Sequence, residues 1–141
     1  MTRIVVDTNV AVSGLLWAGQ PGKLLIRATQ GGCVILATGE MMDELADVLK
    51  REPFVERLQE AGISADEAIA FYHNLIHHCP IPPLADPMCA DGSDRKFIDL
   101  AVSEHAHMLV SGDRHLLALK LAGATPIVTV KEALEVLAQM A

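Results

Sequence analysis

A chain of 141 residues is long enough for one domain with a buried core and too short for two independent ones, so we expect a single domain over residues 1–141. Hydrophobic residues make up 51% of the chain and charged residues 21%, a balance that argues against intrinsic disorder. With 11 Lys and Arg against 18 Asp and Glu, the net charge of −7 argues against a broad basic face for gripping duplex nucleic acid.

Short β-branched apolar runs alternate along the chain with longer stretches of helical spacing. This pattern predicts an α/β fold with a mainly parallel sheet of about five strands. The expected strands are 4–6, 33–36, 76–79, 108–110 and 127–128. The expected helices are 21–30, 39–49 behind an N-cap at Thr38, 54–61 up to Gly62, 65–75 behind Ser64, 94–102, 114–121 before Gly123, and 130–138. Prolines in 81–87 predict an extended path across the domain.

The cysteines and the apolar runs indicate the compartment. Cys33, Cys79 and Cys89 are odd in number and far apart, which fits a reduced intracellular environment. Apolar runs are too short to span a bilayer, and Asp7 interrupts the first one before it could form a signal peptide. We therefore expect a full-length cytoplasmic protein with no membrane association.

Four acidic residues fall at comparable places in four separate segments. Asp7 ends the first strand, Glu44 lies about two turns into the helix after the second, Asp94 begins a helix, and Asp113 follows the fourth strand. Taken singly, each has a structural explanation as a helix cap, turn former or solvated position. Ligands of parallel sheets gather at the carboxyl ends of the strands, however, and four converging acids repel one another unless a cation is bound. Oxygen ligands of this kind favour Mg²⁺ or Mn²⁺.

Such a site suits the hydrolysis of phosphodiester bonds. One or two divalent ions lower the pKa of a bound water and neutralise charge on the leaving oxygen. The metal also supplies the positive charge that an acidic protein lacks. Basic residues beside the proposed ligands are candidates for holding flanking phosphates; those that adjoin the acids are Arg95, Lys96 and Arg114.

Four segments together resemble the PIN domain family in order and spacing. They are Ile4-Val5-Val6-Asp7-Thr8-Asn9-Val10, Met42-Asp43-Glu44-Leu45 with Val48, Leu49 and Arg51, Asp94-Arg95-Lys96-Phe97, and Leu109-Val110-Ser111-Gly112-Asp113-Arg114-His115-Leu116-Leu117. The resemblance covers the chain from Arg3 to about Val130. It is closest to the branch of VapC-like ribonucleases, the toxin components of prokaryotic toxin–antitoxin systems.

The resemblance implies a Rossmann-like, three-layer α/β/α PIN fold and an endoribonuclease that depends on Mg²⁺ or Mn²⁺. It assigns catalysis and metal binding to the family's four acids, which match Asp7, Glu44, Asp94 and Asp113. Asn9 and Ser111 would stand beside them to orient water, and Thr8 would cap the first helix. It also implies an RNA substrate, a small antitoxin partner and a homodimer.

Two departures from the family pattern leave alternatives open. The third motif of the family is richer in acids, whereas Ser93 and Arg95 flank Asp94 here, so either Asp91 or Asp94 is the third ligand. His115 stands where this branch often has a further Asp, a difference that would weaken a second metal site. The same histidine is a candidate for contacting substrate or moving a proton near neutral pH.

Two rival functions remain at this point. In an aspartyl phosphotransfer protein Asp7 would be the nucleophile, but Thr8 and Asn9 follow it where a second acid is needed. In a catalytically silent PIN-like interaction domain, the acids would only cap helices, and Mn²⁺ would not shift the melting temperature. Trp17 beside Leu15 and Leu16 predicts either a partner-binding patch or core packing.

Overall fold

The computed structural model describes residues 1–85 and 92–140. Its strands are β1 (Arg3–Val6), β2 (Val34–Thr38), β3 (His77–Cys79), β4 (Met108–Val110), β5 (Leu121–Ala122) and β6 (Thr125–Val128). Its helices are α1 (Thr8–Leu16), α2 (Gln20–Thr29), α3 (Gly39–Leu49), α4 (Phe54–Ala61), α5 (Ala65–Leu75), α6 (Gly92–Ser103), α7 (Arg114–Leu119) and α8 (Val130–Gln139).

The strands form one sheet in the order β3-β2-β1-β4-β6-β5. All neighbours are parallel except β5 and β6, so the predicted mainly parallel α/β sheet is confirmed. The order runs outward from β1 in one direction through β2 and in the other through β4. The carboxyl ends of β1 and β4 therefore meet where the strand order reverses, the place where open α/β sheets bind ligands.

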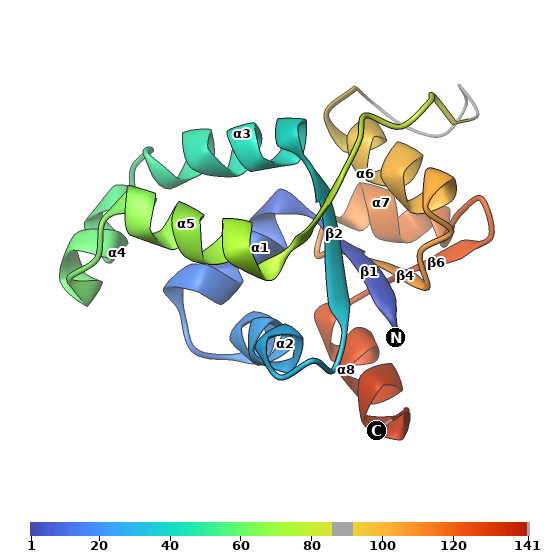
Figure 1. The fold of residues 1–141 in the computed structure, drawn as a ribbon, viewed down its shortest axis with the longest axis horizontal. Helices are drawn as coiled ribbons and strands as arrows, with labels where there is room; N and C mark the ends of the chain where they lie inside the picture. Colours follow the sequence, from blue (N-terminus) through green and yellow to red (C-terminus); the bar gives the residue numbers. More distant parts are fainter. Residues whose placement is uncertain (86–91, 141) are drawn as a thin grey trace.

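Helices cover the sheet on both sides, as the three-layer expectation requires (Figure 1). Helices α1 to α5 lie on one side of the sheet, and α6 and α7 lie on the other (Figure 1). The central strands carry fully buried side chains on both faces, among them Ile4, Ile35 and Leu109. Burial on both faces explains why these strands read as continuous β-branched runs.

Local capping chemistry sets the bounds of α3, α4 and α5 as predicted. The Thr38 hydroxyl accepts a 3.2 Å hydrogen bond from the Met41 amide at the start of α3. Gly62 ends α4 in the left-handed region, with φ of 75°, which glycine adopts without a steric penalty. Ser64 and Glu67 form a capping box at the start of α5.

The expected helix 114–121 is wrong at its end. Lys120 takes a φ of 65°, which ends α7 at Leu119 and turns the chain into the two-residue strand β5. β5 pairs with β6 in the only antiparallel ladder of the described sheet, which therefore has one strand more than expected. Pro126 lies inside β6 rather than before it.

The cap of the first helix also differs from the expectation. The resemblance assigned it to Thr8, but Asp7 caps α1, and its side chain accepts a hydrogen bond from the Val10 amide. Thr8 is the first helical residue, and its side chain is buried. The chain thus places a carboxylate, a stronger acceptor than a hydroxyl, at the positive end of α1.

The start of the proline-rich stretch is extended and is fastened to α6. The Ala85 amide donates a 2.8 Å hydrogen bond to Asp99, and the Arg95 guanidinium donates to the Ala85 carbonyl. Arg95 and Asp99 also form an ion pair of 3.5 Å. Residues 86–91, which include Asp91 and Cys89, lie outside the described residues.

Cys33 and Cys79 are both buried and neither forms a disulfide. No helix in the described ranges has the length and apolar character needed to cross a membrane.

Candidate functional site

The polar groups of the candidate site gather where β1 and β4 end side by side. Val6 pairs with Val110 in the parallel ladder, so Asp7 and Ser111 leave the sheet as neighbours. The backbone continues this register for one more step, since the Asp7 amide donates to the Val110 carbonyl at 3.0 Å. The turn Ser111–Asp113 then leads directly into α7. Two segments about a hundred residues apart in sequence thus meet at one edge of the sheet.

Asp7 is a buried carboxylate held by several hydrogen bonds. Its residue is 5% exposed, its Oδ1 accepts from the Val10 amide at 2.9 Å, and its Oδ2 accepts from the Ser111 hydroxyl. Burial raises the pKa of Asp7, and the negative charge of Asp113 acts in the same direction. The hydrogen bonds from Ser111, Val10 and Gly112 oppose this rise. The ionised form of Asp7 is therefore disfavoured in the folded protein, mainly because burial removes its water.

Asp113 is linked to Asp7 through Ser111. The Asp113 amide donates to the Ser111 hydroxyl oxygen at 2.9 Å, and that hydroxyl donates in turn to Asp7. The Asp113 carboxylate accepts a 2.7 Å hydrogen bond from the His115 amide and caps α7. Asp113 thus lies near enough to raise the pKa of Asp7 while its side chain is half-exposed.

Glu44 lies on α3 and contacts two other elements. Its Oε1 accepts a hydrogen bond from the Thr8 hydroxyl at the start of α1. Its Oε2 forms a 2.5 Å ion pair with the ammonium group of Lys96 on α6. The Lys96 side chain is 14% exposed and the Glu44 side chain 33% exposed, so the pair is largely shielded from solvent.

Of the two remaining acids, only Asp94 lies among the described residues. Asp94 lies in the first turn of α6, two residues before Lys96, and is half-buried. Asp91 lies in the segment 86–91 and so outside the described residues. Within the ranges 1–85 and 92–140, no group of three or more His, Cys, Asp or Glu side chains is arranged to hold a metal ion. The structure brings Asp7 and Asp113 together, whereas Glu44 is turned toward Thr8 and Lys96.

Among the other candidates, three side chains are exposed to solvent, and that of Arg95 is held by an ion pair and a hydrogen bond. Asn9, Arg114 and His115 are exposed around Asp113. Asn9 and Asp113 line the same surface hollow of about 330 Å³. The Arg95 side chain is only 18% exposed and is taken up by Asp99 and the Ala85 carbonyl, contacts that give it a structural role.

Two residues near the acids were not singled out from the sequence as site residues. Thr8 holds Glu44 through its hydroxyl. Tyr72 comes from α5, is 4% exposed, and lies close enough to Asp7 for that carboxylate to add to the rise that burial causes in its pKa. Tyr72 falls on the apolar stripe of its helix, which in the sequence marks it only as a core residue.

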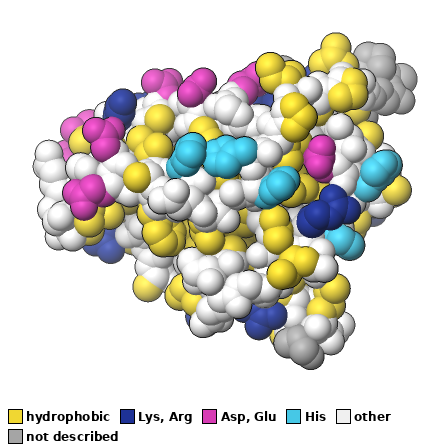
Figure 2. Space-filling view, in the orientation of Figure 1, with side chains coloured by type: hydrophobic (Ala, Val, Ile, Leu, Met, Phe, Trp, Pro, Cys, Tyr) yellow, Lys and Arg dark blue, Asp and Glu magenta, His cyan; other side chains and the backbone are white. Residues whose placement is uncertain are grey.

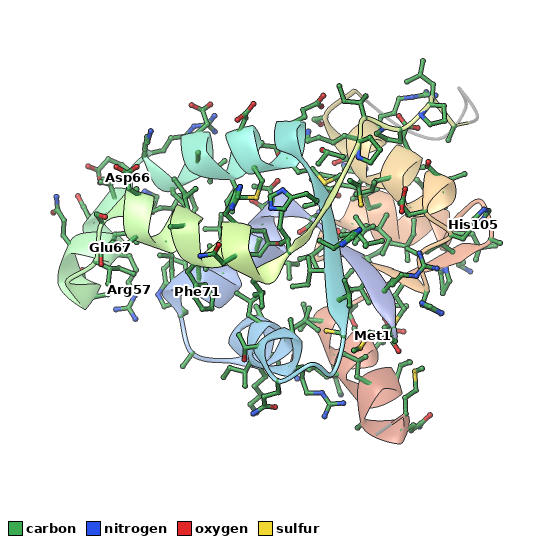
Figure 3. All side chains as sticks on the ribbon, viewed as in Figure 1. Met1, Arg57, Asp66, Glu67, Phe71 and His105 are labelled. Carbon is green, nitrogen blue, oxygen red and sulfur yellow. The ribbon has the colours of Figure 1, made fainter. Side chains whose placement is uncertain are left out.

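A wider hollow than the one at Asn9 and Asp113 lies away from these acids. It has a volume of about 660 Å³ and a mostly apolar lining from α1, α2 and α5 and the loops beside them. Its exposed apolar side chains are Trp17 at 42%, Ile26 at 54% and Phe71 at 48%. Figure 3 labels Phe71 on α5, beside α1. We call this hollow the apolar groove.

The donor chemistry at the sheet edge fits a hard divalent cation. The carboxylates of Asp7 and Asp113 and the Ser111 hydroxyl offer oxygen ligands there, which Mg²⁺ and Mn²⁺ prefer, while Glu44 and Asp94 lie on α3 and α6. One feature of the structure supports a cation here, since Asp7 is a buried carboxylate whose pKa is raised by its burial and by the charge of Asp113.

Comparisons with known proteins agree with this architecture. The family model described as PIN domain matches residues 3–115. The crystal structure of PAE2754 from Pyrobaculum aerophilum is similar, with a TM-score of 0.67, 20% identity and coverage of 98% of both chains. The crystal structure of VapBC2 from Rickettsia felis, bound to a DNA fragment from the VapBC2 promoter, is also similar. Its TM-score is 0.60, its identity is 12%, and the match covers 91% of this chain and 98% of that chain. No curated protein matches the sequence significantly.

Proposed function

We propose, since this chain belongs to the PIN domain family, that it is a metal-dependent endoribonuclease and the toxin of a toxin–antitoxin pair. The similarity to a VapBC complex supports the toxin–antitoxin part of the proposal. We also propose that the protein acts in the cytoplasm as a homodimer.

The observation that carries the catalytic part is the pairing of Asp7 with Asp113 across Ser111. A buried carboxylate beside a second carboxylate is unfavourable unless it has a function or a counter-charge. Here the pair lies at the reversal of strand order, beside the hollow lined by Asn9 and Asp113.

In the proposed mechanism, Asp7, Asp94 and Asp113 would hold Mg²⁺ or Mn²⁺. When bound, the cation supplies positive charge that makes a water molecule a better nucleophile and stabilises the leaving oxygen of the phosphodiester. Glu44 completes the set of acids or orients the attacking water. Ser111 fixes the Asp7 carboxylate and favours its ionised form, because its hydroxyl donates to that carboxylate.

Arg114 and His115 are the protein's own groups for the substrate at this edge. Both are exposed and follow Asp113 directly, and a cationic side chain next to the acids can pair with a flanking phosphate. Acidic side chains line the edge of the molecule over α3 and the start of α5 (Figure 2). That edge would repel RNA, whereas Arg114 and His115 place basic side chains at the start of α7.

A cleavage assay tests the proposed function. End-labelled single-stranded RNA is incubated with the protein in Mn²⁺, in Mg²⁺ and in EDTA, with single-stranded DNA of the same sequence in parallel. We expect cleavage of the RNA that needs the metal and falls by at least about a hundredfold in Asp7→Asn and Asp113→Asn, a range usual for groups that stabilise charge in the transition state. The exposed acid Asp43 on α3 provides the control variant, Asp43→Asn, which should cleave normally. Metal-independent cleavage, or full activity in Asp7→Asn, would refute the proposal.

The antitoxin part predicts a partner on the apolar groove. Trp17, Ile26 and Phe71 expose enough apolar surface there to seat an amphipathic helix of a small partner. Coexpression with the product of the adjacent gene should yield a complex that Ile26→Glu and Phe71→Glu disrupt. Val136→Glu, at an exposed apolar position on α8, is the control and should leave the complex intact.

A further inference from the structure

Lys96 and Glu44 form a contact that joins α6 to α3 across the candidate site. The ammonium group of Lys96 lies 2.5 Å from Glu44 Oε2 and also donates a 2.8 Å hydrogen bond to the carbonyl of Ser93. It sits 5.1 Å from the centre of the Phe97 ring. With 14% of its side chain exposed, Lys96 has given up most of its hydration for these contacts. A lysine held in this way is not a solvated surface charge.

Both oxygens of Glu44 are taken up in this arrangement. Thr8 donates to one of them and Lys96 pairs with the other. Each carboxylate oxygen has two lone pairs, so a divalent cation can share a carboxylate with a hydrogen-bond donor but is repelled by a positive charge that is already bound there. The Thr8 hydroxyl can remain as a second donor, whereas the positive charge of Lys96 directly opposes a cation at the same oxygen.

We propose that Lys96 is the counter-ion that a divalent cation must displace from Glu44, so that Lys96 sets the metal affinity of the site. This inference rests on the proposed function, because it assumes that the acids hold Mg²⁺ or Mn²⁺. Lys96 is a positioning residue in this account. In its paired state it neutralises the Glu44 carboxylate, and in its released state it frees that carboxylate for the cation.

The expected consequence has a definite sign. Two positive charges within a few ångströms in a partly shielded site repel strongly, so removal of the lysine charge should strengthen metal binding. We expect Lys96→Gln to lower the Kd for Mn²⁺ by roughly tenfold or more. Lys96→Arg keeps the charge and should stay within about threefold of the wild type.

The test measures Mn²⁺ binding directly, by titration calorimetry and by the paramagnetic resonance of free Mn²⁺. Lys23→Gln is the matched control, since Lys23 is an exposed lysine on α2 beside the apolar groove and should not affect the metal. A second comparison repeats Lys96→Gln in a Glu44→Gln background. If Lys96 acts by occupying Glu44, its effect on the Kd should shrink at least about threefold there.

The outcomes separate the two proposals. Tighter Mn²⁺ binding in Lys96→Gln that depends on Glu44 supports the inference. Unchanged or weaker binding in a folded Lys96→Gln variant, judged by its melting temperature in EDTA, overturns it. If the wild type binds Mn²⁺ and Asp7→Asn does not, the metal site of the proposed function stands whatever the result for Lys96. If neither the wild type nor Lys96→Gln binds Mn²⁺, both proposals fail.

Discussion

Ser111 and Asp7 lie 104 positions apart in the sequence, yet the Ser111 hydroxyl donates a hydrogen bond to the Asp7 carboxylate in the buried end of the sheet. The same hydroxyl accepts from the amide of Asp113, so one small side chain fixes both acids. Ser111 is fully buried, which leaves no water to replace it.

Ser111→Ala should therefore destabilise the protein. Loss of a hydrogen bond to a buried carboxylate costs about 1–3 kcal/mol of the free energy of unfolding. Because this hydrogen bond lowers the pKa of Asp7, the cost should be largest near pH 8 and shrink as Asp7 becomes protonated at lower pH. Urea unfolding across this range measures it, with Ser103→Ala at the end of α6 as the control. A cost that does not vary with pH would contradict the role given to Ser111.

Asp7→Asn should have the opposite effect on stability in the absence of metal. The pKa of Asp7 is raised in the folded state, so the folded state holds its proton longer and the contribution of Asp7 to stability is lost as the pH rises through that raised value. Asn remains a good N-cap and does not titrate. The stability of Asp7→Asn relative to the wild type should rise with pH above about 4, by about 1.4 kcal/mol for each unit by which the pKa is raised, and then level off.

Urea unfolding in EDTA between pH 4 and 8 gives this curve. Asp43→Asn, at an exposed acid, should give a flat difference across the same range. A difference for Asp7→Asn that falls as the pH rises would mean that Asp7 is better stabilised as an anion than its burial indicates.

Addition of Mn²⁺ should make the wild type more stable than Asp7→Asn, the reverse of the order expected in EDTA. A ligand that binds only the folded state stabilises it by about 2.7 kcal/mol at one hundred times its Kd. The wild type should gain this stability and Asp7→Asn should not, as measured by melting temperature with and without Mn²⁺. Equal shifts in both proteins would place the metal somewhere other than at Asp7.

The contacts of Asp99 on α6 with Ala85 and Arg95 lead to a prediction that concerns stability only. Asp99 is 5% exposed and holds both the Ala85 amide and Arg95, whose Nε atom has no hydrogen-bond partner among the described residues. Asp99→Ala would leave Arg95 buried without its counter-charge and should cost about 3 kcal/mol. The exposed pair of Asp47 and Arg51 provides the comparison, and Asp47→Ala should cost less than about 1 kcal/mol in the same unfolding experiment.

The sequence predicted those parts of the fold that depend on neighbouring residues. Thr38, Gly62 and Ser64 fix the bounds of α3, α4 and α5 because each acts within three or four residues of itself. The end of α7 was missed because Leu119 and Leu121 continue an apolar helical pattern, while the backbone of Lys120 turns to let β5 pair with β6. The pairing of β5 with β6 outweighed the local preference of this segment for a helix.

The candidate site was predictable only in part for the same reason. That Asp7 and Ser111 lie together follows from their places at the ends of two parallel strands, and the parallel sheet could be predicted. The contacts of Glu44 with Thr8 and Lys96 join three helices, and the approach of Tyr72 to Asp7 depends on how α5 packs. Such contacts depend on the distances between packed helices, which spacing along the chain does not contain.

The most direct test of the central claim is a crystal structure of the wild type soaked in Mn²⁺, with anomalous diffraction data. We expect an anomalous peak at the edge of the sheet, within coordination distance of Asp7, Asp113 and Asp94. An empty edge at saturating Mn²⁺, with Asp7 still bonded only to Ser111 and the amides around it, would contradict the claim that these acids exist to hold a cation.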